Sequence, residues 1–364
     1  MGLKQVIGTI AALLAIAGLA SSGSGQTPAQ PLAQPAPTVR PAVEGILAAF
    51  ATHPLVGIAD DHGMAQEQDF YADLVRHPRF AREVGNVVVE FGGAAHQDII
   101  DRYLAGETVP YTELRKVWTN TVGWVPLVSY LGFLNFYAQV RLVNLGLPPE
   151  QRIRVWLGEP PIDWSKINSR ADLMPFIARR DAHAAEIIRR EILAKRKKAL
   201  VIYGGAHFFD SAHPLRGLVE SDHPKALFLV MPYGGHNEKS CDANFEKSIS
   251  GWPVPALATP VRGTSLATAV LAPGCSRLPG LPPMNEQERK TRMEIEEGLA
   301  GLAGDALLYL GPSATLTTSL TSPDIYLDEE YRQEIARRYQ IQTGRTLSSA
   351  IPRVSPRLQR PNQR

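Results

Sequence analysis

Six short apolar runs constrain the fold of this 364-residue chain more than any other feature of its sequence. Most of them are continuously apolar rather than alternating, which is typical of strands buried on both faces of a parallel sheet. Amphipathic stretches separate the runs, and this alternation indicates an α/β domain with a mainly parallel sheet flanked by helices. The expected strands are PLVGIA (54–59), NVVVEF (86–91), RIRVWLG (152–158), KALVIYG (198–204), KALFLVM (225–231) and DALLYLG (305–311). The expected helices span about 64–77, 96–105, 128–145, 171–197, 284–300 and 328–340.

The two ends of the chain differ in composition from the part that carries the strands. Residues 1–20 hold one early cation and then an apolar run that ends in small residues. This pattern predicts a secretory signal peptide, with an uncleaved membrane anchor as the alternative. Residues 21–42 are rich in Pro, Gln, Ala and Ser and predict a disordered linker, and 345–364 carries five arginines without an acid and predicts a disordered basic tail. We therefore expect an exported protein, periplasmic or extracellular, with a single α/β domain at 43–344.

One long stretch, 232–283, does not fit the alternation of strands and helices. It is rich in Gly, Pro and Ser, which predicts an irregular loop excursion that could act as a lid. The stretch contains the two cysteines of the chain, Cys241 and Cys275. In an oxidising compartment they are expected to form a disulfide that ties the loop down, and two buried free thiols are the alternative.

Charge and missing motifs exclude several function classes. The formal net charge is only +2, so we expect no nucleic-acid partner. The sequence lacks a Walker loop, a dinucleotide-binding fingerprint, an HExxH motif and a Gly-x-Ser-x-Gly elbow behind a strand, which disfavours the enzymes that depend on them. The expected partner is a small-molecule or peptide substrate, and no stable membrane span is expected after signal cleavage.

Ionisable side chains follow three of the expected strands. Asp60 and His62 come after the first strand, Glu90 ends the second, and His207 lies behind two glycines after the fourth. Ligands of an open parallel sheet bind beyond the carboxyl ends of its strands, so we expect these side chains to meet in one site. Histidine and carboxylate groups can hold a divalent metal or act as general base and orienting acid. Taken singly, each histidine could instead cap a helix, and Glu90 could pair with Arg180.

The expected helix at 171–197 adds a candidate cation to this site. Arg180 could bind a carboxylate or an anionic substrate group with both arms of its guanidinium. His96 and His236 are weaker candidates, the first because it opens a helix near the second strand and the second because it lies in the irregular loop. The cations at 195–198 suit a helix C-terminus through the helix dipole.

The order and spacing of these motifs resemble a superfamily that groups erythromycin esterase-like proteins, ChaN-type haem-binding lipoproteins and Tiki/TraB proteins. Its members typically show a strand ending in Gly-Glu-x-His or Gly-x-x-His, a second strand ending in Glu, a helix with Arg-Asp and a late strand ending in Gly-x-x-His. The resemblance spans about 45–232, and this chain has Ala59 and Asp60 where the family usually has Gly-Glu. The matching stretches are GIADDHG with His62, VVVEFGG with Glu90, ARRDAHAAEII with Arg180 and Asp181, and VIYGGAH with His207.

The resemblance implies different functions on one scaffold. Tiki-like members are metal-dependent peptidases, erythromycin esterase-like members are hydrolases thought to use a histidine to activate water, and ChaN-like members bind haem. We expect a hydrolase in which His62 and His207, oriented by Glu90 and Asp60, activate water while Arg180 binds substrate or stabilises negative charge. A divalent metal ion could assist, held by His62, Glu90 and His207, with Asp60 as a weaker ligand. The alternatives are a ChaN-like haem- or iron-binding protein involved in iron uptake, and an exported scaffold whose site has decayed.

Overall fold

A computed structural model describes residues 35–123, 130–209, 215–236, 239–270 and 304–347 of the protein. The strands are β1 (Thr38–Pro41), β2 (Leu55–Asp60), β3 (Asn86–Gly93), β4 (Arg154–Glu159), β5 (Ala199–Gly204), β6 (Leu227–Pro232), β7 (Ala256–Thr259) and β8 (Ala306–Tyr309). The longer helices are α1 (Ala42–Ala49), α2 (Ala65–Arg76), α4 (Gln97–Ala105), α7 (Leu131–Leu145), α8 (Arg170–Ile187), α11 (Lys239–Ser248) and α15 (Glu329–Thr343). The shorter ones are α3 (Pro78–Glu83), α5 (Tyr111–Leu114), α6 (Lys116–Thr119), α9 (Ala206–Phe209), α10 (Leu215–Glu220), α12 (Ser265–Val270), α14 (Asp324–Leu327) and the π-helix η5 (Ile188–Leu193).

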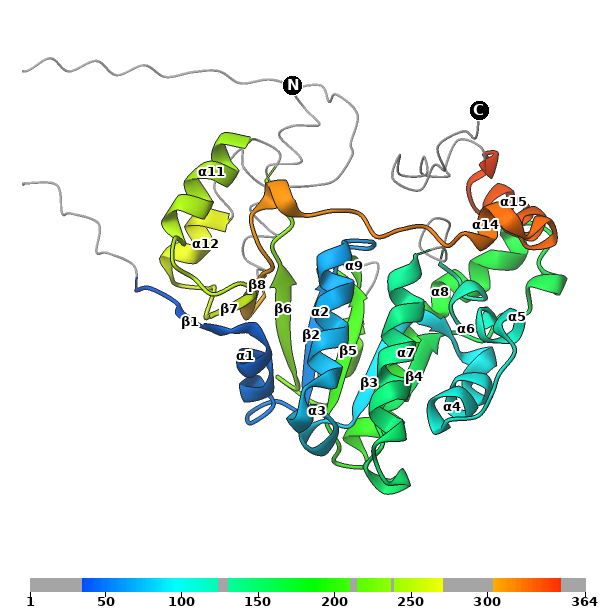
Figure 1. Ribbon diagram of the computed structural model, residues 1–364, viewed down its shortest axis with the longest axis horizontal. Coiled ribbons are helices and arrows are strands. Elements are labelled where there is room, and N and C mark those ends of the chain that lie inside the picture. Colours follow the sequence, from blue (N-terminus) through cyan, green and yellow to red (C-terminus); the bar gives the residue numbers. More distant parts are fainter. Residues whose placement is uncertain (1–34, 124–129, 210–214, 237–238, 271–303, 348–364) are drawn as a thin grey trace, which may run out of the picture. The chain divides into compact units, whose positions relative to one another are not determined.

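The strands form one eight-stranded sheet in the order β1-β7-β8-β6-β2-β5-β3-β4. Its six neighbouring strands from β8 to β4 run parallel, whereas β7 is antiparallel to β8 and β1 is antiparallel to β7. The six parallel strands are the six that the apolar runs predict, so the expected α/β fold is confirmed. The first of them, β2, lies between β5 and β6 (Figure 1), and its last residue, Asp60, is in register with Gly204 at the end of β5. The carboxyl ends of the parallel strands therefore meet at one edge.

Both faces of the sheet are covered by apolar side chains, which is why the strand sequences do not alternate. Val56 and Ile58 of β2 pack in a core with α1, α2 and α7, on the face turned toward the reader in Figure 1. Leu55 and Ala59 of the same strand pack on the opposite face with α8, η5 and α10. Full burial of one such large side chain contributes roughly 2 kcal/mol. The central strands are thereby fixed from both sides.

The structure differs from the sequence predictions at the edge of the sheet. β1 and the start of α1 occupy Thr38–Pro41 and Ala42, inside the range expected to be a linker. The range expected to be an irregular loop, 232–283, contains α11, β7 and α12. β1 and β7 have only four residues each and lie in Pro-rich sequence, so their pairing with each other and with β8 is a tertiary effect that local pattern does not reveal.

Several predictions concern residues outside the described part of the chain. These are the signal peptide at 1–20, most of the linker, the helix at 284–300, Cys275 as the partner of Cys241, and residues 348–364 of the basic tail. They stay predictions.

The helices begin and end close to the expected positions. α8 starts with a reciprocal cap, in which Ser169 accepts from the backbone of Asp172 and Asp172 accepts from the backbone of Ser169. The expected helix at 171–197 consists of two consecutive parts, because the π-helix η5 follows α8 directly before β5 begins. The regular part of α8 carries Arg180 and Asp181 to the carboxyl edge of the sheet.

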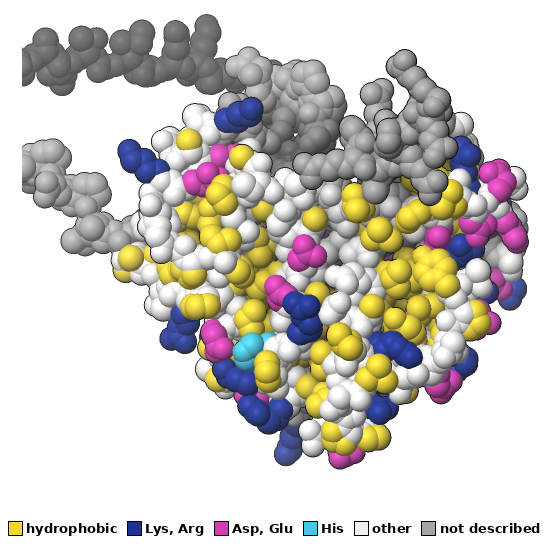
Figure 2. Space-filling view, in the orientation of Figure 1, with side chains coloured by type: hydrophobic (Ala, Val, Ile, Leu, Met, Phe, Trp, Pro, Cys, Tyr) yellow, Lys and Arg dark blue, Asp and Glu magenta, His cyan; other side chains and the backbone are white. Residues whose placement is uncertain are grey.

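Two properties of the described residues bear on possible partners: the length and polarity of the helices and the distribution of charge on one face. Among the described residues, each helix is too short or too polar to cross a bilayer. On the face shown in Figure 2, apolar side chains lie between interspersed cations and anions.

We expect Asn144→Ala to lower the free energy of unfolding by about 2 kcal/mol. Asn144 of α7 is buried and exchanges two hydrogen bonds with the backbone of Ile153, at 2.8 and 2.9 Å, just before β4. Truncation leaves that buried N–H and C=O without their partner. Urea denaturation measures the loss, and Asn135→Ala, at an exposed position of the same helix, is the control that should leave stability within about 0.5 kcal/mol.

Candidate active site

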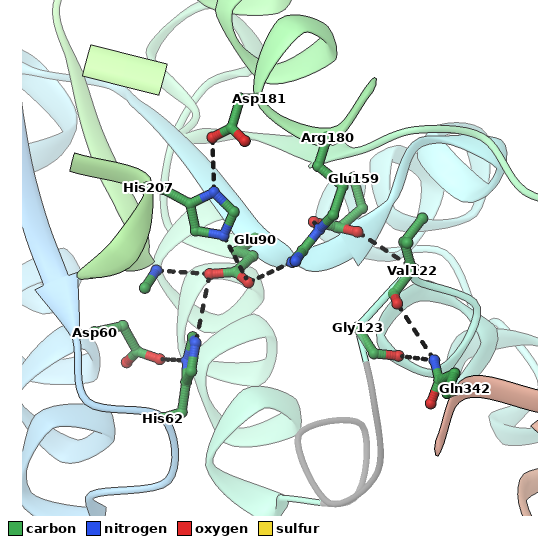
Figure 3. A network of polar contacts seen from close by, with 11 residues as sticks. Asp60, His62, Glu90, Val122, Gly123, Glu159, Arg180, Asp181, His207 and Gln342 are labelled. Atoms are coloured by element: carbon green, nitrogen blue, oxygen red, sulfur yellow. Dashed lines mark hydrogen bonds and ion pairs between the residues drawn. The ribbon is translucent and has the colours of Figure 1, made fainter. Parts of the chain in front are cut away.

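A buried carboxylate, Glu90, lies at the centre of the carboxyl edge (Figure 3). It comes from β3, and both of its oxygens face nitrogen groups from other elements. Oε1 accepts from Nη2 of Arg180 at 2.5 Å and lies 3.4 Å from Nε2 of His207. Oε2 accepts from the backbone N–H of Gly204 at 2.6 Å and lies 3.9 Å from Nε2 of His62. A buried charge requires such partners, because an unpaired one is costly to desolvate.

His62 follows the end of β2 and is oriented by the last residue of that strand. Its Nδ1 lies 2.7 Å from Oδ2 of Asp60, while the other oxygen of Asp60 accepts from the hydroxyl of Tyr71 on α2 at 2.7 Å. Gly63, with φ of 95°, then turns the chain into α2, a conformation that favours glycine. The Asp60 carboxylate therefore fixes the ring so that Nε2 points toward Glu90.

His207 forms a second pair of the same kind. It lies on α9, directly after β5, and its Nδ1 is 2.7 Å from Oδ1 of Asp181 on α8. The Nε2 of this ring also points toward Glu90. The exposures of the two rings differ, because 35% of the His62 side chain is accessible but only 4% of the His207 side chain. His62 is therefore the imidazole that a ligand can reach.

The end of β5 must be glycine for the two halves of the site to meet. A Cβ on Gly204 would lie 2.5 Å from Nε2 of His62 and 3.2 Å from Oε2 of Glu90. The missing side chain leaves the space that the His62 ring occupies. The same glycine donates its backbone N–H to Glu90, so it serves the site in two ways.

Arg180 joins Glu90 to a second buried carboxylate. Its Nε donates to Oε1 of Glu159, the last residue of β4, at 2.8 Å. The other oxygen of Glu159 accepts the backbone N–H of Val122 at 3.1 Å. Gln342 of α15 in turn donates to the carbonyl oxygens of Val122 and Gly123. The C-terminal helix thus supports one wall of the site.

The two histidines carry positive charge near neutral pH. Burial alone lowers the pKa of His62, but the charge of Glu90 and the hydrogen bond and charge of Asp60 raise it to about 9. Burial also lowers the pKa of His207, but hydrogen bonds with Asp181 and Glu90 and the charge of Glu90 raise it to about 9. The imidazolium rings and Arg180 together hold the pKa of Glu90 well below its usual range, against the effect of burial.

Glu67 is a further site residue that the sequence reasoning missed. It lies on α2, is fully buried, and its Oε2 accepts the backbone N–H of Asp61 at 2.9 Å. Its Oε1 has no hydrogen-bond donor within the part of the chain that the structure describes. Burial, and then the charge of Asp60, raise the pKa of Glu67 well above its usual range. Burial and the neighbouring carboxylate thus favour the protonated form of Glu67, and the helical spacing of α2 offered no signal for this.

A small cavity opens beside the network. Its polar side is formed by Asp60, His62, Glu90 and Arg180, and His207 is not among the described residues that line it. The volume is about 20 Å³, which suits a single water molecule. Asp60, His62, Glu90 and Arg180 therefore meet at the cavity. His207 lies behind Glu90 rather than at the cavity.

The predicted metal ligands meet as an ion-pair network. Within the described residues, no group of three or more His, Cys, Asp or Glu side chains is placed to hold a metal ion. Both oxygens of Glu90 already accept N–H groups, from Arg180 and from the backbone of Gly204, which a metal would have to displace. The arrangement as it stands does not fit a metal.

The cavity of about 20 Å³ is too small to enclose haem, since ligand pockets usually measure roughly 300–1,000 Å³.

The two weaker histidine candidates lie elsewhere. His96 contacts Asn120 at 2.9 Å through Nε2 and lines a different surface hollow. His236 follows β6, and its Nδ1 lies 2.9 Å from Asp242 of α11. Neither contacts Glu90 in the described structure.

The sequence reasoning also missed Glu159 as a site residue, although its position at the end of the apolar run of β4 repeats the pattern of the other strand ends.

Comparisons with known proteins find only distant likenesses. No protein-family model matches the chain, and no curated protein matches it. The structure is similar to that of the type III effector HopBA1, with a TM-score of 0.34, 18% identity, and coverage of 55% of this chain and 88% of that one. It is also similar to the structure titled "Cofacial heme binding to ChaN of Campylobacter jejuni", with a TM-score of 0.33, 11% identity, and coverage of 52% and 85%. Likeness at this level establishes neither a shared fold nor a shared function.

We expect the two buried glutamates to respond oppositely to replacement by glutamine. Glu67→Gln should change the free energy of unfolding by less than about 1 kcal/mol, because the raised pKa of Glu67 favours its uncharged form and an uncharged amide has nearly the same shape. Glu90→Gln should cost about 3 kcal/mol, because it leaves the surrounding cations without their counter-ion. Urea denaturation at neutral pH compares the two, and equal losses would contradict the assignment of charge.

We expect the protein to lose stability between about pH 6.5 and pH 9. The folded pKa values of His62 and His207 lie above the unfolded value of 6.5, so their contribution is complete below pH 6.5 and disappears as pH rises through about 9. Asp181→Asn should reduce this loss, because it lowers the folded pKa of His207. Thermal unfolding across this range measures the effect, with the exposed Asp73→Asn as control. A loss that is the same in all three proteins would rule out the histidines as its source.

Proposed function

We propose that the protein is an exported hydrolase of the erythromycin esterase-like or Tiki type that its motifs resemble, with His62 as the base that activates water. The observation that carries the proposal is the pair of Asp–His contacts directed at Glu90 and Arg180, with one of the two imidazoles open to a water-sized cavity. Two imidazoles that aspartates orient and whose pKa values are raised indicate a functional site more than a structural one.

The neutral form of His62 would take a proton from a water held in the cavity. Asp60 keeps Nδ1 protonated, so that the lone pair lies on Nε2, which faces the cavity. The resulting hydroxide attacks the carbonyl carbon of an ester or amide. Asp60 and Glu90 stabilise the imidazolium that forms, which then returns its proton to the leaving oxygen or nitrogen. The products are one carboxylic acid and one alcohol or amine.

Arg180 is the group that meets the developing negative charge. Its Nε and Nη2 are committed to Glu159 and Glu90, but its Nη1 makes no hydrogen bond within the described residues. Because two carboxylates fix the guanidinium, this free edge is oriented before the substrate binds. Such prearranged donors stabilise an oxyanion without further reorganisation.

Three aromatic residues, Phe91, Trp118 and Phe133, also line the cavity. The rings of Phe91 and Phe133 stack with their centroids 4.3 Å apart. Because the cavity of about 20 Å³ holds only the water, the acyl group of the substrate would bind outside it, beside the accessible ring of His62.

His207 is proposed as a positioning residue. It is almost fully buried and reaches the cavity only through Glu90. Its charge, set by Asp181, neutralises part of the charge of Glu90 and thereby tunes the pKa of His62. Loss of His207 should shift the pH dependence of the reaction more than it affects substrate affinity.

We expect hydrolysis to increase with pH up to about 9, because His62 must lose its proton to act as a base. A panel of chromogenic acyl esters and quenched peptides identifies a substrate, and kcat/KM is then followed from pH 6 to 10. His62→Ala should lower kcat/KM by roughly 100-fold or more. Asp60→Asn should move the rising limb of the profile to lower pH.

The matched control is His77→Asn, which replaces a histidine at the N-cap of α3 by another good capping residue. It should leave both the rate and the profile unchanged. A wild-type rate that is independent of pH, or full activity in His62→Ala, would contradict the proposed base.

Haem binding is the alternative from the same resemblance, and titration of the purified protein with haem separates the two. We expect no stoichiometric absorption band, given the size of the cavity. A stoichiometric band that disappears in His62→Ala would instead favour a haem carrier.

A further inference from the structure

A second charged feature lies at the amino edge of the sheet, at the opposite end of the strands from the active site. Arg196, Lys197 and Lys198 connect η5 to β5. Arg196 and Lys197 are exposed and Lys198 is half-buried. Within the described residues, none of the three has an acidic side chain at ion-pair distance. Three adjacent cations raise the local positive potential and so attract anions.

The acids close by in sequence are already engaged. Glu191 pairs with Arg190 at 2.8 Å and with Lys195 at 2.5 Å. Asp222 pairs with Arg189 at 3.3 Å. The negative charge around this edge is therefore used by other cations.

The three cations border a hollow of about 350 Å³. His53 and His223 lie on its other sides, and none of the described residues that line it is acidic. The His53 ring is held in place, because its Nδ1 lies 2.9 Å from the hydroxyl of Thr52 and its face contacts Phe228 at 5.3 Å between centroids. The hollow has the size of a site for a small ligand.

Backbone conformation singles out the same edge. Arg196 and Lys225 are the only non-glycine residues in the described chain with positive φ, at 51° and 59°. Both are basic, and they precede β5 and β6, the two strands on either side of β2. At Arg196 the left-handed conformation ends the helix, because the backbone N–H groups of Arg196 and Lys197 donate to the carbonyl oxygens of Leu193 and Ile192.

The helix dipole does not account for the cluster. Its effect on a cation falls off within the last helical turn. The last residue of η5 is Leu193, so Lys197 and Lys198 lie beyond that turn. Lys195, which is closer to the helix, is paired with Glu191.

We propose that this edge binds a phosphate group, carried either by a soluble phosphorylated molecule or by an anionic lipid headgroup. Arg196 supplies the planar guanidinium that matches two phosphate oxygens, and Lys197 and Lys198 supply point charges. His53 and His223 also line the hollow. This site is independent of the chemistry at Glu90.

Isothermal titration of the full-length protein with pyrophosphate at low ionic strength tests the soluble form of the ligand. Sedimentation with vesicles of phosphatidylcholine, with and without phosphatidylglycerol, tests the lipid form. We expect saturable binding of at least one probe and weakening of about tenfold in Arg196→Gly. The same variant should raise Tm by about 2–4 °C, because glycine adopts a positive φ without penalty. Higher stability with weaker binding is not expected of a merely structural residue.

Lys195→Ala is the matched control, because it removes the same charge two residues before Lys197 but from a cation that Glu191 already neutralises. It should change binding less than about twofold. Binding of pyrophosphate supports a soluble ligand, and binding of phosphatidylglycerol vesicles alone supports a headgroup. Absence of binding to both probes, or equal weakening in Arg196→Gly and Lys195→Ala, would overturn the site.

Discussion

The ionised carboxylate of Glu90, held in the interior by Arg180, His207, His62 and the backbone of Gly204, is the interaction on which the site depends. These partners come from three parts of the chain, the end of β2, helix α8, and the end of β5 with α9, so the charge is tolerated only when these parts and β3 are assembled. The network and the sheet therefore stabilise each other. Loss of a partner would leave this buried charge less well compensated, which costs more than loss of a surface ion pair.

Within the network, two similar Asp–His pairs have different surroundings. The His62 ring reaches the cavity, whereas the His207 ring is enclosed behind Glu90. The two histidines are therefore not interchangeable, although both have raised pKa values and both face the same carboxylate. The proposed chemistry needs one ring that exchanges protons at the cavity and one that holds Glu90 in place from behind. Asp60 and Asp181 supply the orientation that each ring requires.

The parallel strands and the meeting of His62, Glu90, His207 and Arg180 follow from the sequence, because a buried parallel strand is a continuous apolar run and its carboxyl end points to a common edge. Other parts could not be read in this way. β1 and β7 are too short to give a pattern and depend on pairing with each other. Glu67 looks like any polar residue near a helix N-terminus, and only the packing of α2 against β2 buries it. The different exposures of His62 and His207 depend on the packing around each ring, which spacing along the chain cannot indicate.

The most direct test of a charged network centred on Glu90 is a titration of the imidazole nitrogens of His62 and His207 by NMR of the protein labelled at histidine. We expect both rings to titrate near pH 9 and to keep Nδ1 protonated in their neutral forms, since each Nδ1 donates to an aspartate. A pKa at or below 6.5 for either ring, or a neutral form protonated at Nε2, would contradict the network and the role proposed for His62.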